Sequence, residues 1–132
     1  MQDIENIPLY ETGVKAGFPS PAEDEMGSPL NLGAHLIPHP SSTFFIRVVG
    51  DSMQGVGIFS GDLLIVDKSL QPSHGKIVVA LLNGEFTVKR LLIRKESVTL
   101  QAENPAYPSI QVKSSHDFSV WGVVTYVIHR PE

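Results

Sequence analysis

The stretch 76-KIVVALLNGEFTVKRLLI-93 decides the class of fold. Its two halves are rich in Val, Ile, Leu, Phe and Thr, which are residue types that favour β-strands. Asn83 and Gly84 lie between the halves, and both tolerate the positive φ angles that a two-residue hairpin turn requires. The stretch therefore predicts an antiparallel hairpin with strands at residues 76–82 and 85–93.

Further runs of the same composition lie on both sides of this hairpin, at residues 43–49, 62–67, 97–101 and 118–128. Gly, Asn, Asp and Ser separate them, as expected between strands. No segment shows a convincing 3.6-residue repeat. The sequence therefore predicts a mainly β domain over residues 41–132, built as a strongly bent or partly closed sheet.

The first 40 residues have a different composition. They contain six of the ten prolines of the chain. Proline removes a backbone donor and disfavours both helix interiors and central strands. Residues 1–40 are therefore predicted to form an extended N-terminal arm with one short helical turn.

The composition excludes several classes of protein. The chain has 132 residues, a formal net charge of −4 and no cysteine. Its length suits one domain with an appendage. A negative charge without a run of Lys or Arg disfavours direct, sequence-specific DNA binding. The absence of cysteine removes disulfides and thiolate chemistry. The N-terminus has no long apolar run of the kind found in signal peptides and membrane spans, so we expect a cytoplasmic protein.

A glycine-rich loop, 50-GDSMQGVGIFSGD-62, contains the first candidate for chemistry, Ser52. The nucleophile elbow Gly-x-Ser-x-Gly is not present, because Gln54 stands two positions after the serine. Two interpretations of Ser52 compete. It is either an ordinary polar residue of a tight loop, in which Gly50 and its neighbouring glycines permit unusual backbone angles, or a nucleophile that is activated by a base elsewhere.

Histidine is the first type of base to consider. The chain has five, at His35, His39, His74, His116 and His129. A Ser-His pair forms in space rather than along the sequence, so the order of residues leaves this pairing open beside the simpler alternative of surface histidines. No pair has a credible metal-ligand spacing: His35 and His39 are four apart, but Pro38 intervenes. We expect neither a metal nor a cofactor.

Lys89 is the other candidate base. Strand alternation places Thr87 and Lys89 on one face of the predicted strand. A lysine has an unperturbed pKa near 10.4, so a useful base at neutral pH needs that pKa lowered by about three units. Burial against apolar neighbours or a nearby cation such as Arg90 would lower it. The alternative is that Lys89 and Arg90 solvate an edge strand, where lysine is common.

Five motifs occur along the chain in a fixed order: 50-GDSM-53, 61-GDLLIVD-67, 86-FTVKR-90, 102-AENPAY-107 and 121-WGVVTY-126. Together they resemble the self-cleaving LexA/UmuD peptidases. The segment 16-AGFPSPA-22 is similar to the cleavage segment of the UmuD branch, and only 16 residues precede the presumed cut, too few for the DNA-binding domain of a repressor. The resemblance implies a bent, β-rich fold like that of LexA and signal peptidases.

The resemblance also implies roles for particular residues. Ser52 would be the nucleophile and neutral Lys89 the general base, in a loop that includes Gly50, Asp51 and Met53. The scissile bond would join Ala16 to Gly17, with Val14 helping to seat the segment and the Ser52 backbone N–H stabilising the oxyanion.

The implied biology is that of the SOS response to DNA damage. A RecA filament on single-stranded DNA would stimulate self-cleavage. The product, residues 17–132, would be a homodimeric accessory subunit of a UmuC-like, error-prone translesion polymerase. Cleavage within one chain and cleavage of a dimer partner both remain open.

Two other classes of function compete with this one. The chain could be a non-catalytic β-rich interaction module with a flexible arm that docks partners. The simultaneous presence of Ser52, Lys89 and the Ala16–Gly17 bond favours the peptidase. A signal-peptidase-like enzyme also uses a serine and a lysine, but the sequence offers no membrane segment for it.

Overall fold

A computed structural model of the chain describes residues 4–10, 13–14, 16–17 and 27–132. The chain divides into two compact units, Met1–Pro38 and His39–Glu132. Among the described residues, no helix is both long enough and apolar enough to cross a membrane.

The N-terminal unit contains four short elements: η1 (Ile4–Asn6), β1 (Ile7–Leu9), β2 (Ser28–Leu30) and α1 (Leu32–Leu36). The short helix agrees with the predicted helical turn, and the Asn31 side chain caps it by accepting a bond from the Ala34 N–H at 3.1 Å. The two strands differ from the prediction of a purely extended arm. They pair antiparallel with Pro8 opposite Pro29. A two-stranded ribbon accommodates these prolines because the outer side of each strand needs no N–H donor.

The C-terminal unit contains one seven-stranded sheet in the order β3-β4-β9-β5-β6-β7-β8, with every neighbouring pair antiparallel. The strands are β3 (Thr43–Arg47), β4 (Leu63–Asp67), β5 (Ile77–Leu82), β6 (Glu85–Arg94), β7 (Ser97–Gln101), β8 (Ile110–Val112) and β9 (Phe118–Ile128). Two 3-10 turns, η2 (Pro40–Ser42) and η3 (Gln54–Val56), complete the unit. The mainly β prediction is confirmed, and the sheet is open rather than closed into a barrel.

The β5–β6 hairpin forms as its sequence predicts. Leu82 is opposite Glu85, which leaves Asn83 and Gly84 as a two-residue turn. Their φ angles are 50° and 82°, in the left-handed region that this turn requires.

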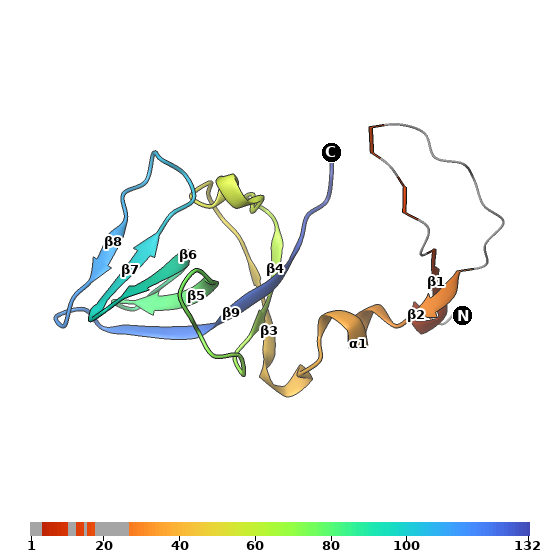
Figure 1. Cartoon of the computed structure of the whole chain (residues 1–132), viewed down its shortest axis with the longest axis horizontal. Helices are drawn as coiled ribbons and strands as arrows, with labels where there is room; N and C mark the ends of the chain where they lie inside the picture. The colour runs from red at the N-terminus through yellow and green to blue at the C-terminus, as the bar shows by residue number, and fades with distance from the viewer. Residues whose placement is uncertain (1–3, 11–12, 15, 18–26) are drawn as a thin grey trace. The chain divides into compact units, whose positions relative to one another are not determined.

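Strand β9 bends the sheet. Its first half pairs with β5 and its second half with β4, and the register shifts between Val79 and Ala80 and between Ile65 and Val66. Such bulges bend and twist the strands that contain them. A Cβ at Gly122 would lie 2.6 Å from the Val66 side chain, so this close crossing requires glycine. In Figure 1, β3 and β4 consequently run at a large angle to β5–β7.

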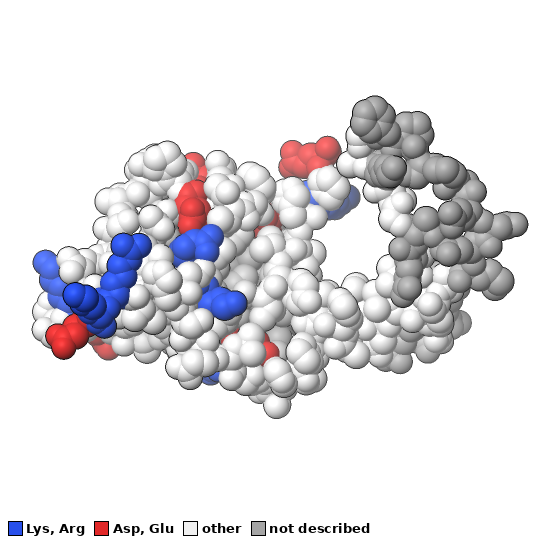
Figure 2. Space-filling view, viewed as in Figure 1, with Lys and Arg blue, Asp and Glu red and all other residues white. Residues whose placement is uncertain are grey.

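The bent sheet encloses two apolar clusters. The first packs the Ser52 loop against the sheet and contains Val48, Met53, Ile58, Leu64, Val66 and Val79. The second lies under the β5–β7 part and contains Val78, Ala80, Leu91, Leu100 and Val123. On the face in Figure 2, the Lys and Arg side chains of the described residues form no continuous basic band, and Asp and Glu side chains lie among them.

Candidate active site

Ser52 lies in the loop that joins β3 to β4. Gly50 has a φ of 98°, which lets the chain turn sharply just before the serine. Met53 directly after it is buried at 2% exposure, and Ile58 further along is buried at 1%. These two apolar anchors hold the loop on the core while Ser52 itself faces a groove.

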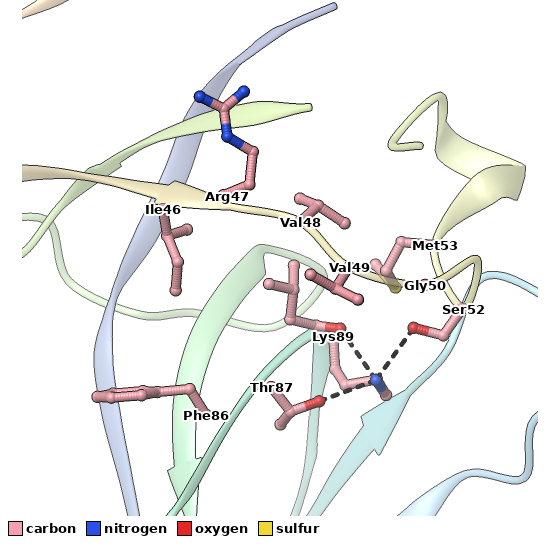
Figure 3. Close-up of a pocket in the computed structure, with 11 residues that line it drawn as sticks. Ile46, Arg47, Val48, Val49, Gly50, Ser52, Met53, Phe86, Thr87 and Lys89 are labelled. Carbon is pink, nitrogen blue, oxygen red and sulfur yellow. Dashed lines mark hydrogen bonds between the residues drawn. The ribbon is translucent and has the colours of Figure 1, made fainter. Parts of the chain in front are cut away.

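Lys89 projects from β6 towards the same place (Figure 3). Its Nζ atom lies 3.3 Å from Ser52 Oγ, 2.9 Å from Thr87 Oγ1 and 3.1 Å from the Val88 carbonyl oxygen. Thr87 contributes because alternate residues of a strand share a face. The structure therefore brings together Ser52 and Lys89, which are 37 positions apart in the sequence.

The protonation of Lys89 is shifted towards the neutral amine. The side chain is half-buried, and burial lowers the pKa of its ammonium group below the ordinary lysine value. Arg90 is not the cause: its guanidinium pairs with Glu103 and donates to the Gly75 carbonyl at 2.5 Å. Within the part of the chain that the structure describes, Lys89 forms no ion pair that would hold its positive charge.

The three oxygen atoms around Lys89 Nζ can bond with the neutral amine as well as with the ammonium. A neutral amine has two N–H donors and one lone pair, whereas an ammonium has three donors and no acceptor. The Val88 carbonyl can only accept, and Thr87 Oγ1 can accept as well. The lone pair then remains for the Ser52 O–H. The arrangement can thus take a proton from serine without moving either side chain.

The pair lines a groove of about 260 Å³. One wall comes from the end of β3 and the residues after it, and the other from the beginning of β6; Figure 3 shows Val49 and Phe86 on opposite sides. The full lining is Ile46, Arg47, Val48, Val49, Gly50, Ser52, Met53, Phe86, Thr87, Val88 and Lys89.

Both walls of the groove carry backbone groups without a strand partner among the described residues. Strand β3 is the end strand of the sheet, and β7 pairs with β6 only from Arg90 onward. The Leu91 N–H donates to the Lys76 carbonyl oxygen, and the Leu91 carbonyl oxygen accepts from the Gly75 N–H. Both backbone groups of Leu91 therefore point towards the β5 side. Alternation therefore points the backbone groups of Val88 and Phe86 towards the open side. The alternative that Lys89 lies on an edge is correct in this limited sense, but its side chain is half-buried rather than solvating.

The histidines have other contacts. Two pair with buried carboxylates, His39 with Asp67 at 2.7 Å and His129 with Asp62 at 2.6 Å. His74 and His116 accept bonds from backbone N–H groups. Among the described residues the Ser52 hydroxyl has Lys89 as its hydrogen-bond partner and no histidine. No three His, Asp or Glu side chains of the described part of the chain form a cluster that could hold a metal ion.

The remaining predicted residues occupy distinct positions. Asp51 is fixed from outside the loop by Tyr107, whose hydroxyl donates to its carboxylate at 2.5 Å. Val14 belongs to the N-terminal unit and is 91% exposed. Ala16 and Gly17 are exposed in the same unit. The neighbouring residues of the predicted cleavage segment, Lys15 and residues 18–22, lie outside the described part.

Comparison with known proteins identifies the family. Residues 8–125 match the family described as Peptidase S24-like. The chain belongs to this family. Protein SamA of Salmonella typhimurium is 46% identical over 123 residues, covering 93% of this chain and 85% of SamA. Protein MucA of Escherichia coli is 44% identical over 130 residues, covering 97% and 88% of the two chains. The LexA repressor of Shewanella piezotolerans is 37% identical over 147 residues, covering 96% and 71%.

These S24-like relatives confirm the sequence-based resemblance to the LexA/UmuD peptidases. Strand alternation grouped Thr87 with Lys89 in the sequence, but it did not show that the Thr87 hydroxyl bonds with Lys89 Nζ. No local signal indicated that Asn104 and Tyr107 contact Asp51, more than 50 positions away.

Proposed function

We propose that this S24-like protein is a UmuD-like protein of the SOS mutagenesis response, which cuts its own Ala16–Gly17 bond as a serine peptidase. Ser52 is the nucleophile and Lys89 the general base. The observation that carries the proposal is the 3.3 Å contact between Ser52 Oγ and a half-buried Lys89 Nζ.

The reaction proceeds in two halves. Neutral Lys89 takes the Ser52 hydroxyl proton while Oγ attacks the carbonyl carbon of Ala16, giving a tetrahedral oxyanion. The Ser52 backbone N–H supports that oxyanion; it donates to no acceptor among the described residues. Collapse breaks the bond to Gly17, whose nitrogen leaves with the proton from Lys89. Water, deprotonated by Lys89, then attacks the Ser52 ester; the ester bond breaks, Ser52 Oγ takes the proton back from Lys89, and the carboxylate of Ala16 is freed.

The groove suits an extended peptide. Backbone donors and acceptors on β3 and β6 remain for strand pairing, which is a common way to bind a peptide segment. The methyl side chain of Ala16 and the absence of a side chain at Gly17 allow the bond to approach Ser52 closely, and the exposed Val14 is available for an apolar contact. A docked segment also excludes water from Lys89, which lowers its pKa further and favours the neutral base.

The substrate segment belongs to the same chain, which makes docking an intramolecular or intradimer event. Thirty-five positions separate Gly17 from Ser52. A chain of that length spans at most on the order of 100 Å, so both routes are within reach. The dependence of the rate on protein concentration separates them, because cleavage within one chain is independent of concentration.

The proposed partners act on either side of cleavage. A RecA filament on single-stranded DNA stabilises the docked state and supplies no chemistry. The product, residues 17–132, forms a homodimer that serves a UmuC-like translesion polymerase in the cytoplasm. These partners are what the resemblance to the LexA/UmuD peptidases implies; the family and the similarity to SamA and MucA support that resemblance.

Intact-mass spectrometry of the full chain tests the proposal. The protein is incubated at pH 7 and at about pH 10, where more of an ordinary lysine is neutral. Ser52→Ala and Lys89→Ala are compared with Ser115→Ala and Lys113→Ala, which change the same residue types at exposed positions. We expect wild type and the two matched controls to yield a fragment that begins at Gly17, and the first two variants to stay whole.

The opposite result has a defined meaning. A wild-type chain that stays whole at pH 10, and also with RecA filaments and ATP, contradicts the peptidase proposal. The non-catalytic interaction module then becomes the better account of the fold. Cleavage that persists in Lys89→Ala retains a peptidase but overturns the role of Lys89 as base.

A further inference from the structure

The segment of residues 102–107 contacts the Ser52 loop immediately before the serine. The Tyr107 hydroxyl donates to Asp51 Oδ1 at 2.5 Å, and the Asn104 side-chain amide donates to the Asp51 carbonyl oxygen at 2.9 Å. Asn104 is held in turn, because its Oδ1 accepts from the Ala106 N–H at 2.9 Å. Asp51 is therefore fixed through both its side chain and its backbone.

The same segment contacts the loop again after the serine. The Gly55 N–H donates to the Glu103 carbonyl oxygen at 2.8 Å. A Cβ at Gly55 would lie 2.5 Å from that oxygen, so the two backbones are packed without room for a side chain. Contacts at positions 51 and 55 thus bracket Ser52.

The segment also reaches the strand that carries Lys89. The Glu103 carboxylate pairs with Arg90, the residue that follows Lys89 in β6, and both side chains are about three-quarters buried. Arg90 is further fixed by its bond to the Gly75 carbonyl. One short segment therefore connects the backbone beside the serine to the backbone beside the lysine.

We infer that residues 103–107 form a positioning clamp that sets the separation of Ser52 Oγ and Lys89 Nζ, with Tyr107 as a positioning residue for the serine loop. The catalytic part of this inference rests on the proposed function. The contact between the two reacting groups is long for a hydrogen bond at 3.3 Å and cannot by itself fix a loop. The shorter bonds of the clamp lie outside the groove, where a docked peptide would not displace them.

The charge of Asp51 strengthens the bond to Tyr107. A hydrogen bond to a carboxylate is stronger than one between neutral groups. The bond and the negative charge together raise the pKa of the Tyr107 hydroxyl, which keeps it protonated as a donor. Misplacement of a reacting group by about 1 Å can slow a reaction roughly 100-fold, so loss of this donor should be visible in the rate.

Rates of self-cleavage of the full chain, followed by mass spectrometry across alkaline pH, test the clamp. We expect Tyr107→Phe and Asp51→Ala each to slow cleavage roughly 10- to 100-fold without moving the pH midpoint of the rate. Asp51→Asn keeps an acceptor for Tyr107 and should retain most of the rate. Tyr126→Phe is the matched control, because the Tyr126 side chain is 41% exposed and its hydroxyl has no hydrogen bond among the described residues.

Hydrogen exchange provides a measurement that does not depend on catalysis. The Gly55 amide should exchange about tenfold faster in Tyr107→Phe than in wild type or Tyr126→Phe, because its bond to Glu103 opens more often. An unchanged Gly55 exchange rate in Tyr107→Phe overturns the clamp, whether or not the wild type cleaves itself. The clamp also fails if Tyr107→Phe cleaves within twofold of wild type, or if Asp51→Asn is as slow as Asp51→Ala. A wild type that never cleaves, with faster exchange in Tyr107→Phe, overturns the proposed function and supports the clamp on the loop.

Discussion

Replacing Thr87 by valine should move the pH dependence of self-cleavage in an unusual direction. Thr87 Oγ1 lies 2.9 Å from Lys89 Nζ and accepts a hydrogen bond from it in both protonation states. A bond from a charged donor contributes about 1.5–3 kcal/mol and one from a neutral donor about 0.5–1.5 kcal/mol. Loss of the threonine oxygen therefore costs the ammonium form about 1 kcal/mol more than the neutral amine.

That difference becomes a shift of the pKa. One pKa unit corresponds to about 1.36 kcal/mol, so the Lys89 pKa should fall by about 0.7 unit in Thr87→Val. Because the reaction needs the neutral amine, the rising limb of the rate should move to lower pH by the same amount. The maximum rate should fall about tenfold, since the amine loses one of the contacts that orient it.

The assay is the first-order rate of loss of the full-length chain between about pH 7 and 11, with folding checked by circular dichroism at each pH. Thr87→Ser is the matched control, because it retains the hydroxyl and should keep the wild-type midpoint. A midpoint in Thr87→Val that stays in place or moves to higher pH would refute the reasoning from the charge of the donor.

Three further predictions concern stability. Burial lowers the pKa of Lys89 in the folded chain, so the positive charge of Lys89 opposes folding at pH 7. Lys89→Met should therefore raise the Tm at pH 7. The gain in Tm should shrink as the pH approaches about 10.4, because an ordinary lysine then loses its charge in the unfolded chain as well. Hydrogen bonds from Ser69 and His39 lower the pKa of the Asp67 carboxyl group in the folded chain. The ionised carboxylate therefore stabilises the fold above about pH 4, and this stabilisation is lost as the pH falls through the folded-state pKa of Asp67. Urea unfolding of Asp67→Asn should therefore show lower stability at pH 7 and a shallower loss between about pH 4 and 2. Gly122→Ala should destabilise by about 1–3 kcal/mol in urea unfolding because its Cβ meets the Val66 side chain, while Gly13→Ala, with nothing within 4 Å, should be neutral.

Local chemistry made most strands predictable. The β5–β6 hairpin follows from β-branched residues around Asn83 and Gly84, and these signals act within a few residues. Strand β8 was missed because three residues are too few to show alternation. The strands β1 and β2 were missed because each contains a proline, and the sequence does not reveal that each is an edge strand.

The residues of the site could be predicted from the sequence, but their burial and their contacts with distant residues could not. Motif resemblance selected Ser52 and Lys89, which the structure places in contact. The surroundings of Lys89 on β6 depend on long-range contacts: β7 pairs with β6 only from Arg90 onward, and the Ser52 loop, 37 positions away, contacts Lys89. The burial that lowers the pKa of Lys89 depends on the same long-range arrangement, as do the contacts of Asp51 with Asn104 and Tyr107.

The three oxygen atoms around Lys89 Nζ affect how fast Lys89 can gain or lose its proton. Both the ammonium and the neutral amine find partners there without a change of rotamer. Loss of the proton is then limited by exchange with water and not by rearrangement of the protein, whereas motion of a chain segment takes nanoseconds to microseconds or longer. A rapid pH jump would therefore charge or discharge the amine within the mixing time of the instrument. Any slower phase in the approach to cleavage would measure the arrival of the arm, separately from the chemistry.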